Sequence, residues 1–112
     1  MSLLLLDDED IFSKIISILS KSLGFDFFYA KNIHEAKNIL KERDITLAII
    51  DYTLTESDGV TFNRYIKENF PDVKTAIFTG APEFMEKEQL DAFTYHIGKD
   101  ELVEFIRKYF KK

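Results

Sequence analysis

Five polar residues follow short apolar runs, and their side chains are of the types that handle magnesium and phosphate: Asp7, Asp8, Asp51, Thr79 and Lys99. Crowded carboxylates repel one another unless a cation neutralises them, and Mg²⁺ prefers hard oxygen ligands of this kind. A lysine ammonium is a point-charge ligand for phosphate, and a threonine hydroxyl can donate a hydrogen bond to it. The set therefore suits an aspartate that forms an acyl phosphate beside a bound metal ion.

Taken singly, these residues have simpler explanations. An aspartate at the end of a strand, such as Asp51, commonly forms a side-chain-to-backbone turn. Asp7 and Asp8 also suit the start of a helix, where the helix dipole favours acids. Their spacing along the chain favours a functional site, because the five residues follow four different predicted strands.

The chain alternates between two kinds of pattern. Apolar runs predict strands at residues 3–6, 25–30, 45–50, 73–80 and 94–97. Helical spacing predicts helices at residues 7–24, 33–44, 60–70, 82–93 and 101–110. Strands that are almost continuously apolar, with helices between them, predict a parallel sheet covered on both faces. Ligands of such open sheets bind at the carboxyl ends of the strands, where the five polar residues fall.

Local signals mark the ends of the first two helices. Phe12 and Ile15 lie on the apolar stripe expected to face the core, and Gly24 supplies the stop. Asn32 followed by Glu35 resembles a capping box.

The last two helices carry weaker signals. Pro82 suits the first turn of the fourth helix, and Asp100 is expected to be the N-cap of the fifth. The sequence does not decide whether Phe84, Phe93 and Phe105 lie on a binding surface or in the core.

The composition is that of one ordinary folded domain. The 112 residues are 46% hydrophobic and 31% charged, and we treat residues 1–112 as a single domain whose first two residues belong to an expression start. The absence of cysteine excludes disulfides, thiolate catalysis and cysteine-based zinc sites. The net charge of −5 argues against direct binding to nucleic acid or an anionic membrane. The apolar run at residues 3–6 is too short for a signal peptide or a membrane span, so we expect a cytoplasmic protein.

The segments "LLLLDDED", "LAIIDYTLTESDG", "AIFTG" and "IGKDELVEFI" occur in this order and cover most of the chain. Together they resemble the receiver domain of two-component response regulators, similar to chemotaxis regulators. The resemblance implies a flavodoxin-like three-layer α/β sandwich, a doubly wound five-stranded parallel sheet in the order 2-1-3-4-5. It also implies a signalling phosphoprotein rather than a classical enzyme, with slow autodephosphorylation.

The resemblance assigns a role to each residue of the site. Asp51 would accept a phosphoryl group from a histidine kinase. Asp8 and Asp51 would bind Mg²⁺ directly, Asp7 through water, and Thr53 through its backbone carbonyl.

The remaining residues would read the phosphoryl group. Thr79 and Lys99 would contact it, and Gly80 would leave room for Thr79 to move. His96 occupies the position where the family usually has a switch aromatic residue, although a bulge would bring Tyr95 there instead. Output would come from repacking the fourth helix, fifth strand and fifth helix.

Besides His96, two further positions depart from the family pattern. Asp100 replaces the usual proline after the lysine, so we expect a trans bond there. Thr55 replaces a common proline, which predicts a less rigid loop above Asp51.

Two other functions remain open from the sequence. One is a receiver-like interaction module that is never phosphorylated. The other is a haloacid-dehalogenase-type phosphatase, whose Asp-x-Asp motif is echoed at Asp51 but with Thr53 in place of the second acid. As a receiver, the chain would be a stand-alone regulator or part of a longer protein, and would need an effector domain or target. Dimerisation on phosphorylation is left open.

Overall fold

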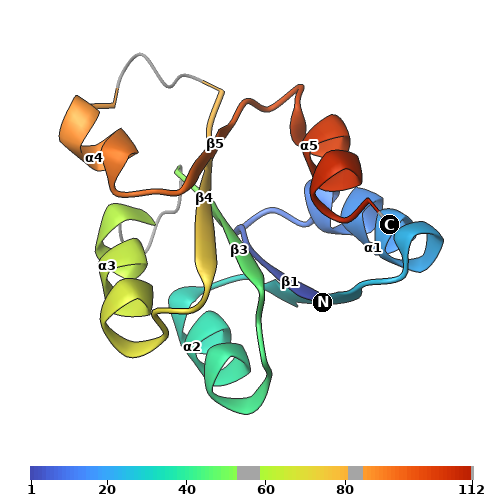
Figure 1. The fold of residues 1–112 in the computed structure, drawn as a ribbon, viewed down its shortest axis with the longest axis horizontal. Helices are drawn as coiled ribbons and strands as arrows, with labels where there is room; N and C mark the ends of the chain where they lie inside the picture. The colour runs from blue at the N-terminus through green and yellow to red at the C-terminus, as the bar shows by residue number, and fades with distance from the viewer. Residues whose placement is uncertain (53–58, 81–84, 112) are drawn as a thin grey trace.

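The computed structural model describes residues 1–52, 59–80 and 85–111, and the predicted alternation of strands and helices is present in them (Figure 1). In chain order the elements are β1 (Ser2–Leu6), α1 (Ile11–Leu23), β2 (Asp26–Ala30), α2 (Ile33–Glu42), β3 (Leu47–Asp51), α3 (Gly59–Asn69), β4 (Lys74–Phe78), α4 (Lys87–Asp91), β5 (Tyr95–Ile97) and α5 (Leu102–Tyr109). Thr53, Thr55, Pro82 and Phe84 lie outside the described residues, so the predictions about them are not addressed by the structure.

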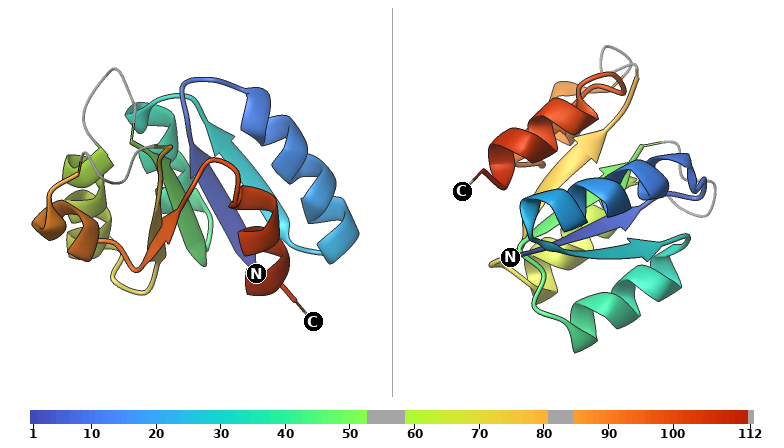
Figure 2. Two further views of the ribbon diagram at one scale, coloured as in Figure 1. Left: turned by 90° about the horizontal axis from the view of Figure 1, so that it is seen from above. Right: turned by 90° about the vertical axis from the view of Figure 1, so that its right-hand side faces the viewer.

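The five strands form one parallel sheet in the order β2-β1-β3-β4-β5. Helices α1 and α5 cover one face, and α2, α3 and α4 cover the other (Figures 1 and 2). The α/β fold class and the strand order predicted from the sequence are therefore confirmed. Among the described helices, none has the length and apolar character that a bilayer crossing requires.

The central strands are buried on both faces, which is why their sequences do not alternate between apolar and polar residues. In β1, Leu3 and Leu5 pack with α1 and α5, whereas Leu4 and Leu6 pack in the cluster that includes α2 and α3, and all four are 0% exposed. Burial of this kind contributes about 1.5–3 kcal/mol for each such side chain. The buried strands therefore hold the carboxyl edge of the sheet rigidly in place.

The Gly24 stop of α1 and the Asn32 cap of α2 are confirmed. The Glu35 side chain accepts from the Lys31 N–H and not from the Asn32 N–H, so the second bond of the predicted capping box is made to the preceding residue. Gly24 ends α1 in the left-handed region, at φ 78°, and its N–H donates to the Ser20 carbonyl over 2.9 Å. Asn32 Oδ1 accepts a hydrogen bond from the Glu35 N–H over 2.8 Å and so caps α2. The prediction for Ile15 was wrong, because this side chain is 37% exposed and lies on the outer side of α1.

The starts of the last two helices differ from the predictions. Asp100 was expected to be the N-cap of α5, but Glu101 holds that position, because the Glu101 carbonyl accepts the first helical bond, from the Phe105 N–H. Residues 98–101 instead form a turn closed by the Glu101 N–H and the Gly98 carbonyl. The Lys99–Asp100 bond is trans, as predicted.

Helix α4 is shorter than the predicted residues 82–93. Its N-cap is Glu86, whose backbone N–H donates to the Gln89 side chain over 3.0 Å. At the other end, the Phe93 N–H returns to the Leu90 carbonyl in a tighter turn that ends the helix. Phe93 is 4% exposed and belongs to the core, while Phe105 is half-buried on α5.

Candidate functional site

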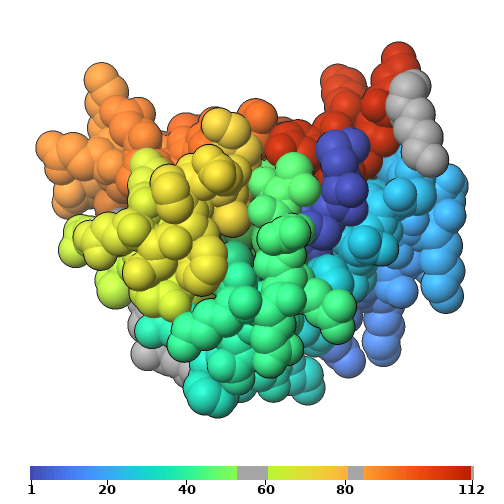
Figure 3. Space-filling view, turned by 60° about the horizontal axis from the view of Figure 1, so that its bottom comes forward, coloured from blue at the N-terminus to red at the C-terminus, as the bar shows by residue number. Residues whose placement is uncertain are grey.

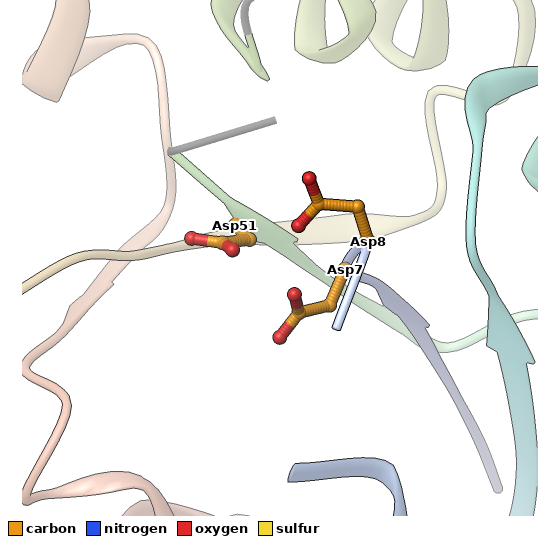
Figure 4. A group of neighbouring side chains, drawn as sticks. All are labelled: Asp7, Asp8 and Asp51. Carbon is orange, nitrogen blue, oxygen red and sulfur yellow. The ribbon is translucent and has the colours of Figure 1, made fainter. Parts of the chain in front are cut away.

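Three carboxylates from two strands meet at the carboxyl edge of the sheet. Asp7 and Asp8 follow β1, Asp51 is the last residue of β3, and each offers an oxygen atom within 4.8 Å of the others (Figure 4). Asp7 is 1% exposed and Asp51 is 2% exposed, while Asp8 is half-buried. The sequence-based prediction that these residues come together is confirmed, and their oxygen atoms form a donor set suited to a hard divalent cation.

Backbone pairing continues past the strand ends and holds this edge in place. The Asp7 N–H donates to the Ala30 carbonyl over 3.1 Å, and the Thr79 N–H donates to the Ile97 carbonyl over 3.0 Å. The Tyr29 hydroxyl adds a bond of 2.8 Å to the backbone carbonyl of Asp7. The edge is therefore fixed from β2 to β5 before any ligand binds.

Asp7 shows the electrostatic cost of this crowding. Burial, and to a lesser extent the neighbouring charge of Asp51, raises the pKa of Asp7 to about 7. The Glu9 N–H, which donates to Asp7 Oδ1 over 3.0 Å, opposes the shift but does not cancel it. A cation bound between the carboxylates would relieve this cost.

Lys99 lies on the other side of Asp51. Its Nζ donates to Asp51 Oδ1 over 3.1 Å, and the lysine side chain is 33% exposed against 3% for the aspartate. Asp51 therefore has an ammonium group on one side and two carboxylates on the other. An atom bound to Asp51 would meet a fixed positive charge at once.

The residues predicted to read the site border a shared groove, which is lined in part by Thr79, Gly80, His96 and Lys99. Thr79 is 3% exposed and directly follows β4. His96 is exposed on the α4 side of the sheet, where its Nε2 donates to the Leu90 carbonyl over 2.6 Å.

Tyr95 points to the opposite face of β5 from His96. Its ring lies 5.4 Å from the Phe105 ring and 5.6 Å from the Tyr109 ring, both on α5. Strand β5 thus alternates regularly, as predicted, and no bulge brings Tyr95 to the α4 side.

Lys99 has aromatic surroundings that were not predicted from the sequence. The rings of Phe78 and Phe12 lie 4.0 and 5.4 Å from Nζ, measured to the ring centroids. Phe12 had been assigned only to the core-facing stripe of its helix. Phe78 had one feature in the sequence that indicates a place near the site, since it is the last apolar residue before Thr79.

The family described as "Response regulator receiver domain" matches residues 3–111. Among curated proteins, the photosynthetic apparatus regulatory protein RegA of Cereibacter sphaeroides is 30% identical over 79 residues, covering 70% of this chain and 43% of the relative. An NtrX-like response regulator of Rickettsia bellii is 32% identical over 82 residues, covering 71% of this chain and 17% of the relative. The chain thus matches less than half of the length of these relatives.

Solved structures show the same fold at lower identity. The response regulator TrrA of Thermotoga maritima, solved in complex with Mg²⁺-BeF, has a TM-score of 0.80 at 22% identity, with 96% of each chain covered. The beryllofluoride-activated NtrC4 receiver domain dimer has a TM-score of 0.77 at 23% identity, with 98% of this chain and 96% of that chain covered. The sheet order, the acidic edge and the match over residues 3–111 agree, and this chain belongs to the receiver domain family of two-component response regulators.

Proposed function

We propose that Asp51 is the phosphoacceptor of this receiver and takes a phosphoryl group from the phosphohistidine of a histidine kinase. The observation that carries the proposal is the placement of the buried Asp51 carboxylate between Lys99 and the acidic pair Asp7 and Asp8. A buried carboxylate with a charged partner on each side is poised for nucleophilic attack once a metal ion offsets the acids.

The residues at the edge fit Mg²⁺. Asp8 and Asp51 would bind the ion directly and Asp7 through water, and the backbone carbonyl of Thr53 is the fourth protein ligand that the family resemblance supplies. The elevated pKa of Asp7 supports a cation at this place, because it reflects a carboxylate that is buried and lies beside the negative charge of Asp51. When bound, the ion would neutralise charge on the phosphoryl oxygens.

In the transfer step, an oxygen of Asp51 attacks phosphorus while the bond between phosphorus and the donor imidazole nitrogen breaks, and the electron pair stays on that nitrogen. The product is an acyl phosphate on Asp51 and a free histidine on the kinase. The Lys99 ammonium pairs with the new phosphoryl oxygens, and the Thr79 hydroxyl donates to them. Slow attack by water on phosphorus would return the carboxylate and release inorganic phosphate, so the domain acts as a timed switch rather than as a classical enzyme.

His96 is the proposed switch partner of Thr79. The bond from His96 Nε2 to the Leu90 carbonyl holds its ring on the outer, α4 side of β5. Movement of Thr79 toward the phosphoryl group would favour rotation of the His96 side chain inward, toward Thr79. The bond to the Leu90 carbonyl would then be lost, and the population of α4 positions would shift. The α4, β5 and α5 surface would then engage an effector domain or target, or a second phosphorylated copy.

The test is phosphorylation by acetyl phosphate, with and without Mg²⁺, read by intact mass. We expect the wild-type protein to gain one phosphoryl group only with Mg²⁺, and Asp51→Asn to gain none. Asp26→Asn removes an exposed acid at the start of β2 and serves as the matched control that still reacts. Equal labelling of Asp51→Asn would contradict the assignment, and an unreactive wild type would favour the interaction module that is never phosphorylated.

A further inference from the structure

The Lys99 ammonium lies against two aromatic rings as well as against Asp51. Its Nζ is 4.0 Å from the centroid of the Phe78 ring and 5.4 Å from that of the Phe12 ring. Both distances are within the range in which a cation is attracted to a ring face. The same atom is 3.1 Å from Asp51 Oδ1, so the ammonium is held between a carboxylate and aromatic carbon.

The two rings are fixed by separate parts of the fold. Phe78 is the last residue of β4, is 0% exposed and pairs in register with Asp51 on β3. Phe12 is half-buried in the first turn of α1. Its ring meets that of Phe78 edge to face, with centroids 4.8 Å apart and planes at 90°, which is a favoured aromatic geometry.

The stem of Lys99 is confined as well as its head. A Cβ atom added at Gly80 would lie 3.2 Å from Lys99 Cγ, so the stem crosses Gly80 where any larger residue would press on it. Gly80 thus makes room for the lysine, a role beyond the room for Thr79 that the sequence suggested. Confinement at both ends removes much of the rotamer freedom that an exposed lysine has.

We propose that Phe78 and Phe12 are positioning residues that hold the Lys99 ammonium beside Asp51 through attraction between the cation and the ring faces. The inference rests on the proposed function, because the two rings would keep the positive charge of Lys99 in place before the phosphoryl group arrives at Asp51. A charge fixed in advance costs no reorganisation during the reaction. The rings would otherwise be ordinary core residues that touch a lysine by chance.

Fluorination separates these two readings. Fluorine atoms on the phenylalanine ring draw electron density from its face while changing its size little, so they weaken attraction for a cation and leave apolar packing nearly intact. We suggest replacing Phe78 by phenylalanines with one, two and three fluorine atoms on the ring. The same series at Phe62 is the matched control, because Phe62 is 2% exposed in the core on the opposite face of the sheet.

The measured quantity is the rate of phosphorylation by acetyl phosphate with Mg²⁺, with thermal unfolding followed in parallel. We expect the rate to fall stepwise along the Phe78 series, by about threefold to tenfold at three fluorines. The Phe62 series should be flat, and neither series should move the unfolding temperature appreciably. Phe12→Leu should lower the rate by a smaller factor, because the Phe12 ring is farther from Nζ than the Phe78 ring. Phe12→Tyr should keep the rate near that of the wild type, because tyrosine retains an aromatic face.

A second arm repeats the Phe78 series in Lys99→Met, which keeps an apolar stem and removes the charge. The dependence on fluorination should vanish in this background, as a double-mutant cycle requires of a direct interaction. A flat Phe78 series in the Lys99 protein, or equal slopes at Phe78 and Phe62, would overturn the inference. Either result with a normally phosphorylated wild type leaves the proposed function standing, whereas an unreactive wild type would fault the function itself.

Discussion

Asp7 and Lys99 act on the charge of Asp51 in opposite senses. The Asp7 carboxyl makes a second negative charge at the edge unfavourable, and its own pKa rises to about 7 as a result of burial and of Asp51. The Lys99 ammonium forms an ion pair of 3.1 Å with Asp51 and so offsets its negative charge. Near neutral pH, Asp7 is therefore expected to take up or release a proton.

This arrangement predicts how the stability of the metal-free protein depends on pH. The folded pKa of Asp7 is about 7 against an ordinary value of 3.8, so the folded chain binds more protons than the unfolded chain between these two pH values. The free energy of unfolding should therefore rise as pH falls from about 7.5 to about 5.5. This gain in stability should be lost again as pH rises through the folded pKa of Asp7. The Asp7 contribution is at most about 4 kcal/mol. Urea unfolding at several pH values with a chelator present measures it.

Asp7→Asn should flatten this profile, because the amide does not titrate. Asp26→Asn, which removes an exposed acid at the far edge of the sheet, should keep the wild-type slope. An unchanged slope in Asp7→Asn would mean that another group carries the dependence.

At the residue scale, the site residues whose positions depend on strand order alone could be predicted from the sequence. Asp7, Asp51 and Thr79 follow apolar runs, and parallel strands bring their carboxyl ends to one edge whatever the side-chain details. The rings beside Lys99 could not be foreseen, because Phe12 has the same signal as any core residue of an amphipathic helix. Only the three-dimensional register of β3 with β4 brings Phe78 beside Asp51.

Helix α4 is held at its C-terminal end by side chains from two neighbouring elements. His96 on β5 donates to the Leu90 carbonyl, and Asn63 on α3 donates from Nδ2 to the Ala92 carbonyl over 2.8 Å. The helix itself has only five residues, so its own hydrogen bonds fix it weakly. The position of α4 therefore depends on these two side chains.

Removal of the Asn63 side chain should loosen α4. Asn63 is 1% exposed, so Asn63→Ala leaves the Ala92 carbonyl without this donor and is expected to cost about 1–3 kcal/mol. Amide hydrogen exchange across residues 87–93 should accelerate more than exchange in β1 or β3. Asn69→Ala is the control, because Asn69 donates to Tyr65 within α3 itself. Equal protection of residues 87–93 in Asn63→Ala and the wild type would show that α4 is held by other contacts.

At the element scale, long periodic segments were predicted well and short ones poorly. The apolar stripe and glycine stop of α1 predicted its body and its C-terminal end, although the helix begins at Ile11 and not at the predicted residue 7. Helix α4 has a thin apolar pattern, and its start depends on a hydrogen bond from the Glu86 backbone N–H to the Gln89 side chain. The start of α5 was displaced by one residue because an aspartate and a glutamate stand side by side, and the choice between them is made by the turn from Gly98.

The whole molecule should respond to Mg²⁺ through its stability. A ligand that binds only the folded chain raises the free energy of unfolding, by about 2.7 kcal/mol at a hundredfold excess over its dissociation constant. Asp8→Asn should remove most of this gain, and lowering the pH should reduce it, because protons compete at Asp7. Thermal unfolding in MgCl₂, compared with NaCl of equal ionic strength, separates binding from screening. An Asp8→Asn protein stabilised as strongly as the wild type would place the ion elsewhere.

The start of β1 and the end of α5 lie near each other at the amino edge of the sheet (Figures 2 and 3), whereas the acids lie at its carboxyl edge. Met1 is tied at the amino edge by its carbonyl, which accepts a bond from the Asp26 N–H over 3.0 Å at the start of β2. One five-residue strand, about 17 Å long, separates this edge from the Asp51 edge. A fluorophore, a surface anchor or a pulling handle attached at either end of the described chain would therefore lie about one strand length from Asp51.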